Sequence, residues 1–524
     1  MSPRAAAGSR PAFNRSAYER DLEAYLSERE EELYQHAAGL HDELALGPIN
    51  TRHAKLFTRD RVDALRTLVE AGGDEVGRNR ALLTVATDGY VEGRVAAMTD
   101  AIGSAEATAE VVWRGERIPY RALHNRISDI PGRAERNGLF ASYLEVEEAL
   151  NPMRRERFEQ IAATARELEY ADYVALIKTT RGFDPDALGS EIRDFLAESE
   201  TPYFAALRRY LARIEIEQGD ASLADLWYLL RGNGWDHWFD ARRAISVLAA
   251  TLLGLGIDLS HQKGATLDVE ARPHKSPRAF VAVVRSPTDV RLVIQPHGGW
   301  DDYGAILHEA GHLEHFLHVD PSLPVESREL GDWAVTEGYA MTMERLLAEP
   351  DWLVEQLGMP REHADAFADF FSLYHLVTMR GLAARHLHEL RMHRGGDAEL
   401  HRATFAGLAG LLVGVRQPPE LYLSIDDGMY AASYLRSFML DASLTDYLAT
   451  RHGPAWWRSA AAGETLKRAW SRGQEWNAEQ VVAHLGYDSL DWRPVVRQIR
   501  AKLVGEMSGY GGPNITTRAG TRKV

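Results

Sequence analysis

The sequence predicts a mainly α-helical protein with one small β region. Charge-rich amphipathic stretches with helical spacing fill much of the chain, and β-branched runs gather only within residues 265–295. The chain has 524 residues, which is more than a single hydrophobic core usually serves, so we expect two or more lobes. No stretch approaches about 18 uninterrupted apolar residues, and we therefore expect no membrane span.

Six stretches combine dense charge with apolar residues spaced three or four positions apart, which is typical of a helix that buries one face. Four prolines are expected to mark turns between these helices, because proline lacks a backbone donor and clashes with the preceding turn. The predicted helices are 15–46, 55–100, 152–181, 186–217, 361–394 and 397–415, and the prolines are Pro131, Pro152, Pro185 and Pro202.

A soft domain boundary is expected near 230–236, where two glycines and a group of tryptophans interrupt the helical pattern. We place a helical N-terminal lobe at 15–235 and a second region at 236–504. The start of the chain has basic residues but no long apolar run, so 1–14 is predicted to be a flexible tail and not a secretory signal. The glycine-rich end, 505–524, is predicted to be a second flexible tail.

The β region consists of three β-branched runs at 265–271, 278–285 and 290–295. The sequence Ser-Pro-Thr-Asp at 286–289 is a good hairpin turn. An exposed edge strand of such a ribbon can pair with an extended peptide through main-chain hydrogen bonds. The alternative is a structural ribbon that only covers the helix that follows it.

Composition excludes several classes of protein. A net charge of −16 argues against a general nucleic-acid binder, which needs a basic surface to displace counterions. The chain has no cysteine, which rules out disulfides, thiolate metal sites and a cysteine nucleophile. We expect a cytoplasmic protein.

Residues 308–312 read HEAGH and match the pattern H-E-x-x-H. On a helix, His308 and His312 share one face, so their imidazoles can bind one metal ion. Glu309 lies at the edge of that face and can reach a water on the metal without being a ligand, which suits a general base. Flanking apolar residues at helical spacing support the helix. The alternative is a helix with two surface histidines and a solvated glutamate.

A catalytic zinc usually has three protein ligands, and two residues compete for the third position. His318 falls where the longer pattern H-E-x-x-H-x-x-G-x-x-H places its third histidine, but His315 replaces the glycine at which the helix must break. On an unbroken helix His318 lies about 15 Å along the axis from His308, which is too far to share an ion. The first reading is therefore disfavoured.

The second reading takes Glu337 as the third ligand. Residues 319–331 read as a loop, and Asp332 can cap a new helix that runs to about Glu349. Glu337 has mostly apolar neighbours on this helix, so we expect it to face inward, where a carboxylate needs a partner. A metal ion is one such partner, and a salt bridge to Arg328 is the alternative.

This arrangement, with Glu337 25 residues after His312, resembles the thimet oligopeptidase and oligoendopeptidase F family of zinc metallopeptidases. Residues 276–299 look like the β-ribbon of that family, and residues 426–448 look like its tyrosine-bearing segment. The likeness extends over about 257–450.

The resemblance implies a two-lobed helical body with a deep central channel that admits short peptides and excludes folded proteins. It implies one Zn²⁺ per chain, held by His308, His312 and Glu337, with Glu309 as the general base. Residues 236–504 would then form the zinc-binding catalytic region.

The resemblance also points to tyrosines that donate a hydrogen bond to the oxyanion. Tyr434 matches the family through Ser-Tyr-Leu, whereas Ala431 and Ala432 stand where the family has two tyrosines. Tyr430, one residue away, is a second candidate. The alternative for both tyrosines is a place in the core.

For the other candidate residues near the motif, we favour structural roles over functional ones. Asp332 can cap its helix or orient a ligand imidazole. We expect His274, His297, His315 and His318 to be surface or packing residues, with substrate contact as the alternative for His297.

Two other functions remain as alternatives to a peptidase. One is an inactive binding protein that keeps the fold, and the other is a metal-dependent hydrolase of non-peptide amides.

Overall fold

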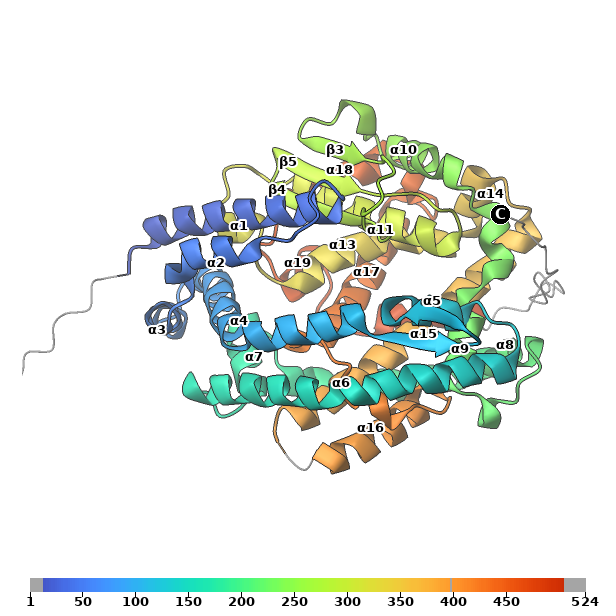
Figure 1. Cartoon of the computed structure of the whole chain (residues 1–524). Helices are drawn as coiled ribbons and strands as arrows, with labels where there is room; N and C mark the ends of the chain where they lie inside the picture. The colour runs from blue at the N-terminus through green and yellow to red at the C-terminus, as the bar shows by residue number, and fades with distance from the viewer. Residues whose placement is uncertain (1–12, 396–397, 504–524) are drawn as a thin grey trace, which may run out of the picture.

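The computed structural model describes residues 13–395 and 398–503, and within them the protein is mainly helical with two small β-sheets (Figure 1). This confirms the predicted fold class at the level of secondary structure. The flexible tails predicted at 1–14 and 505–524 lie outside the described residues, apart from the last two residues of the first. None of the described helices is both long and apolar enough to cross a bilayer.

Helices and one short hairpin make up the N-terminal half of the described chain. The hairpin pairs β1 (Glu110–Trp113) with β2 (Glu116–Pro119) in antiparallel fashion. The helices are α1 (Arg15–Ala37), α2 (Leu46–His53), α3 (Arg59–Glu70), α4 (Val76–Thr108), α5 (Tyr120–Ser128), α6 (Arg133–Glu167), α7 (Tyr173–Arg181), α8 (Pro185–Arg213) and α9 (Leu223–Arg231).

The predicted helix 15–46 ends early, at Ala37, and the predicted helices 55–100 and 152–181 are divided in the structure. Soon after the ends of α1, α3 and α6 a residue adopts the left-handed conformation, which a right-handed helix cannot continue. These residues are Gly39, Gly72 and Glu169, with φ angles of 70°, 69° and 68°. The amphipathic pattern therefore located the helical regions but missed the breaks within them.

The turns predicted at Pro152 and Pro202 are wrong, because both residues lie inside long helices, α6 and α8. A proline inside a helix removes one hydrogen bond and crowds the preceding turn. Both helices bury residues on either side of their proline, and this packing outweighs the lost hydrogen bond. The other two prolines behave as expected, since Pro131 precedes α6 and Pro185 is the first residue of α8, where no donor is needed.

The C-terminal half holds a three-stranded sheet and the remaining helices, joined by short 3-10 segments. The helices are α10 (Ala244–Gly254), α11 (Trp300–Leu317), α12 (Val325–Arg328), α13 (Trp333–Glu344), α14 (Pro350–Leu357), α15 (Arg361–Met392), α16 (Ala398–Val413), α17 (Tyr430–His452), α18 (Ala460–Trp470), α19 (Ala478–His484) and α20 (Arg493–Leu503).

The sheet has the order β3 (Ala265–Asp268), β5 (Asp289–Val293) and β4 (Phe280–Arg285). Strand β5 pairs with β4 in antiparallel fashion and with β3 in parallel fashion, so β4 is an edge strand. The sheet lies beside α11, as Figure 1 shows. The predicted ribbon next to the helix of the HEAGH motif is therefore confirmed.

Helix α11 lies between this sheet and α13, and α13 in turn packs against α17. Two glycines permit the close approach of these helices. A Cβ atom at Gly311 would lie 2.5 Å from Cα of Ala340, and one at Gly338 would lie 2.7 Å from the side chain of Leu440. Real Cβ atoms do not come so close to other atoms, so both positions require glycine. The contact fixes how α11 and α13 face each other.

The main hydrophobic cluster draws buried side chains from both sides of residues 230–236, from Tyr18 to Leu503. A smaller cluster, which includes Leu123 and Leu139, lies around the β1–β2 hairpin.

Candidate metal centre

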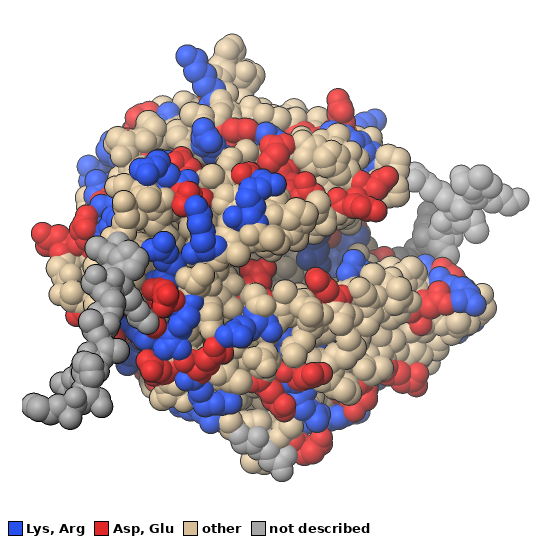
Figure 2. Space-filling view, turned by 60° about the vertical axis from the view of Figure 1, so that its left-hand side comes forward, with Lys and Arg blue, Asp and Glu red and all other residues tan. Residues whose placement is uncertain are grey.

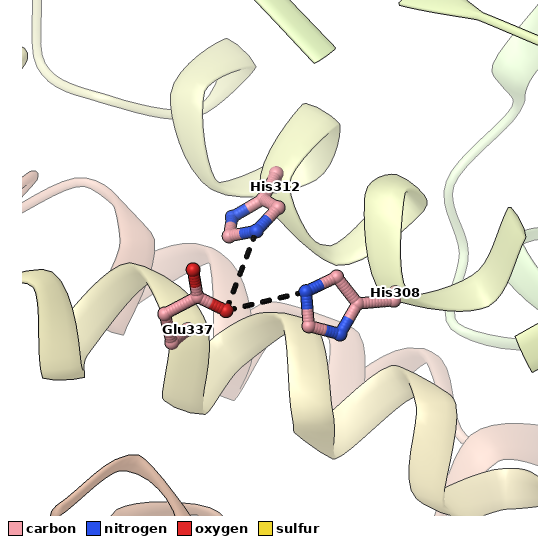
Figure 3. Close-up of side chains that lie close together, drawn as sticks. All are labelled: His308, His312 and Glu337. Atoms are coloured by element: carbon pink, nitrogen blue, oxygen red, sulfur yellow. Dashed lines mark ion pairs between the residues drawn. The ribbon is translucent and has the colours of Figure 1, made fainter. Parts of the chain in front are cut away.

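Three predicted ligands come together between α11 and α13. His308 and His312 lie one turn apart on α11, and Glu337 faces them from α13 (Figure 3). One carboxylate oxygen of Glu337 lies 3.2 Å from Nε2 of His308 and 3.9 Å from Nε2 of His312. Their ligand atoms all lie within 4.8 Å of one another. This is the one such group of three metal-ligating side chains among the described residues.

The surroundings of Glu337 suit a cation. The residue is buried, with 6% of its surface exposed, and its Oε2 accepts no hydrogen bond, although it faces the two imidazoles. The other oxygen accepts a hydrogen bond of 2.7 Å from the Tyr430 hydroxyl. Arg328, the alternative partner, instead pairs with Glu23. A buried carboxylate oxygen and two imidazole nitrogens directed at one point match the donor set that zinc prefers.

Further side chains hold the two imidazoles in place. Nδ1 of His308 lies 3.0 Å from a carboxylate oxygen of Glu344, and Nδ1 of His312 lies 2.8 Å from the Thr336 hydroxyl. The second carboxylate oxygen of Glu344 lies 3.5 Å from Nε2 of His375 on α15. These contacts leave Nε2 of each imidazole facing Glu337, as a metal-binding histidine requires.

Sequence reasoning missed these supporting residues. Glu344 follows Glu337 by seven positions on the same helix, which returns it to the same face, so helical spacing is a signal that could have found it. Thr336 precedes Glu337 directly. No local pattern points to His375, because it lies on a helix that is distant in sequence from the other site residues.

Burial and charge shift the pKa values of these groups. Burial lowers the pKa of His312 to about 4, so its ring is neutral at pH 7, the form that binds metal. Burial alone would also lower the pKa of His308, but its contacts with Glu337 and Glu344 outweigh burial and raise it. Burial opposes ionisation of Glu337 and Glu344, yet the neighbouring histidines lower the pKa of both carboxyls.

Glu309 lies half-buried beside the edge strand β4. Burial raises the pKa of its carboxyl to about 7, and the charge of Glu337 adds to this, while His308 and a hydrogen bond from the backbone of Val281 oppose it. A pKa near neutrality suits a group that takes up and returns a proton at physiological pH. The contact with Val281 places the carboxyl at the free edge of the sheet.

The two candidate tyrosines begin α17 and lie together, with ring centroids 4.9 Å apart and an interplanar angle of 82°. Tyr430 directs its hydroxyl to Glu337. Burial and the charges of Glu337 and Glu309 raise the pKa of Tyr434, so its hydroxyl keeps its proton. Both tyrosines therefore lie at the candidate site, and they occupy different positions in it.

Asp332 caps α13 and does not touch a ligand imidazole. Its side chain accepts a hydrogen bond from the backbone N–H of Ala334 and forms an ion pair of 2.7 Å with Arg436. This agrees with the favoured reading of the sequence.

The remaining histidines lie outside the ligand set. His315 is fully buried, and His318 hydrogen-bonds through Nδ1 to the backbone carbonyl of Glu314 on its own helix. Helix α11 continues without a break to Leu317, so His318 stays away from the other two ligands. His274 and His297 are exposed.

Comparison with known proteins does not assign this chain to a family. Neither a scan against models of protein families nor a search of curated proteins found a match.

Proposed function

We propose that this protein is a zinc-dependent peptidase of the oligopeptidase type, similar to the thimet oligopeptidase family. The convergence of His308, His312 and Glu337 on one point, with Glu309 beside it, is the observation that carries this proposal. A bound zinc ion would acidify a water molecule and polarise the carbonyl of the bond to be cleaved.

Glu309 takes the proton of the attacking water in this proposal. Its raised pKa lets the carboxylate accept that proton near pH 7 and later pass it to the leaving amine. Its place on α11, next to His308 but outside the group of three ligands, leaves it free for this task.

The two tyrosines take different roles in this proposal. The hydroxyl proton of Tyr430 already lies in a hydrogen bond to Glu337, so Tyr430 holds the third ligand in place. Tyr434 keeps its proton and is the better donor to a negative oxygen that forms during the reaction.

Short peptides are the proposed substrates. The backbone of the edge strand β4 approaches Glu309 at Val281, so a peptide that extends this sheet would pass beside the general base. Figure 2 shows a deep hollow in one face of the molecule, which supports the proposed two-lobed arrangement with a central channel. A peptide backbone can form hydrogen bonds with an edge strand, whereas a small amide without a backbone can form few of them.

Glu309→Gln tests the proposed role of the base. We expect turnover to fall by about 10²–10⁴-fold, because the amide cannot accept the proton, while zinc remains bound. Peptide cleavage followed by mass spectrometry, together with metal analysis of the same preparation, measures both quantities. Turnover equal to that of the wild type would remove Glu309 from the mechanism.

A digest of mixed short peptides, run beside a panel of small non-peptide amides, tests the substrate class. We expect peptides to be cleaved and the amides to remain intact. Cleavage of the amides alone would replace the peptidase with an amide hydrolase, and binding of peptides without cleavage would indicate a protein that keeps only the fold.

A further inference from the structure

Tyr430, which donates a hydrogen bond to the candidate ligand Glu337, is the first residue of α17. Met429 before it has a left-handed backbone, with a φ angle of 52°, and its side chain forms no capping hydrogen bond. A helix that starts without a cap has backbone N–H groups in its first turn that no capping side chain satisfies. The position of Tyr430 therefore depends on contacts with other parts of the chain.

Two residues of α7 contact this helix start. Tyr173, the first residue of α7, accepts a hydrogen bond of 3.1 Å from the backbone N–H of Gly428. Arg181, the last residue of α7, lies beside the same glycine. A Cβ atom at Gly428 would lie 3.0 Å from the guanidinium of Arg181 and 3.4 Å from the ring of Trp333. The segment that leads into Tyr430 therefore passes directly against Arg181 and Trp333.

Arg181 reaches Tyr430 through the ring of Trp333. Its guanidinium carbon lies 3.8 Å from the centroid of that ring, and tryptophan is the side chain that forms the strongest cation–π contacts. The ring of Trp333 lies in turn 4.8 Å from that of Tyr430, centroid to centroid, with an interplanar angle of 60°. Tyr430 donates to Glu337 at 2.7 Å. A continuous series of contacts therefore runs from Arg181 to the third candidate ligand.

Asp88 on α4 holds the guanidinium of Arg181 in place. The two side chains form an ion pair of 2.8 Å, and 8% of the Arg181 side chain is exposed. A planar guanidinium that is bonded at its edge can still stack its face on an aromatic ring. Arg181 therefore lies between Asp88 and Trp333, and it joins α4 and α7 to α13, which carries Glu337. Its small exposed surface makes it a poor direct partner for a substrate.

We propose that Arg181 is a positioning residue for the metal centre and acts through Trp333 and Tyr430 on the carboxylate of Glu337. This inference rests on the zinc site of the proposed function. Loss of the guanidinium would free the two rings, and the carboxylate would lose the orientation in which it faces the two imidazoles. Groups that orient metal ligands usually lower metal affinity when they are removed. Arg181 lies further from the ligand than Tyr430, so we expect a smaller effect than that of Tyr430→Phe.

The zinc affinity of Arg181→Met tests this proposal, measured on the full chain by competition with a chromophoric chelator. Methionine keeps much of the side-chain length but has no charge, and the affinity should fall by about threefold or more. Arg181→Lys should recover part of the loss, because an ammonium group also interacts with an aromatic face. Arg209→Met is the matched control, since Arg209 likewise pairs with a carboxylate on another helix, that of Asp369, and lies over an aromatic ring, that of Tyr210. It should leave the affinity unchanged.

A double-mutant cycle separates positioning from a general weakening of the fold. In a Tyr430→Phe background, Arg181→Met should cause no further loss of zinc affinity, because the hydroxyl through which Arg181 acts is already absent. A general weakening would lower the affinity by the same factor in both backgrounds, and that result would overturn the proposal. Circular dichroism should show that each variant is folded.

Hydrogen exchange of the zinc-free chain gives a readout that does not depend on the proposed function. Arg181→Met should raise the exchange rate of residues 428–434, whereas Arg209→Met should not. Unchanged exchange there, or equal zinc affinities of the two variants, would overturn the proposal. A wild-type chain that binds no zinc would instead refute the proposed function, and exchange would still decide whether Arg181 holds the start of α17.

Discussion

Glu344 determines which nitrogen of His308 faces Glu337, because its carboxylate contacts Nδ1 of that ring at 3.0 Å. His375 steadies the same carboxylate. We predict that Glu344→Ala weakens zinc binding about 10–100-fold, since the imidazole loses the partner that orients it. Competition with a chromophoric chelator measures this affinity. Glu355→Ala, which removes an exposed carboxylate, should leave the affinity unchanged, and equal affinities in both variants would show that Glu344 does not position the ligand.

Tyr434 and Tyr430 should respond differently to the loss of their hydroxyl groups. Tyr434→Phe is predicted to lower kcat about 10²–10³-fold with zinc affinity unchanged, because it removes only a donor to the developing oxyanion. Tyr430→Phe should instead weaken zinc binding, because it frees the carboxylate of Glu337. Steady-state kinetics and metal titration of both variants distinguish the roles, and the reverse pattern would exchange them.

At the scale of single residues, the spacing of residues along the sequence predicted most of the candidate site. His308, Glu309 and His312 were predictable because helical geometry alone sets their relation. Glu337 required a second helix to be placed, and its apolar neighbours indicated that it faces inward. His375 could not be predicted, since only the packing of α15 brings it to Glu344.

At the scale of elements, α15 carries a buried carboxyl that lowers the stability of the protein near neutral pH. Glu389 is fully buried, neither of its oxygens has a hydrogen-bond partner, and burial raises the pKa of its carboxyl from 4.5 to about 8. The folded protein therefore keeps a proton that the unfolded chain releases, and stability falls as the pH rises from about 4.5 to 8.

Glu389→Gln should remove this dependence on pH. We predict little change in the free energy of unfolding at pH 4.5 and a gain on the order of a few kcal/mol at pH 8, because the amide cannot ionise. Urea denaturation at both pH values measures the difference. A gain of equal size at both pH values would mean that Glu389 does not titrate in this range.

The elements themselves were predictable where the signal is local. The runs of β-branched residues predicted all three strands of the larger sheet, and apolar periodicity predicted α11. Prolines 152 and 202 misled the prediction, because tertiary packing of α6 and α8 outweighs one missing hydrogen bond in each helix. The breaks at Gly39 and Glu169 depend on single backbone conformations, which an amphipathic pattern does not encode.

At the scale of the whole molecule, the position of the metal centre depends on the packing of α11 against α13. Gly311 allows this packing, because any larger residue would meet the backbone of Ala340. The sequence pattern predicted that the two helices meet, but it could not predict the distance between them. The two-lobed arrangement, which we expect from chain length and from family resemblance, stays a prediction.

Metal analysis of the purified chain tests the central claim most directly. Inductively coupled plasma mass spectrometry, after exposure to zinc and removal of the excess, should find about one zinc per wild-type chain. Glu337→Ala should lose most of it, because one of three ligands is gone while the fold is kept, as circular dichroism would verify. A wild-type chain without zinc, or a Glu337→Ala chain with its full complement, would contradict the account.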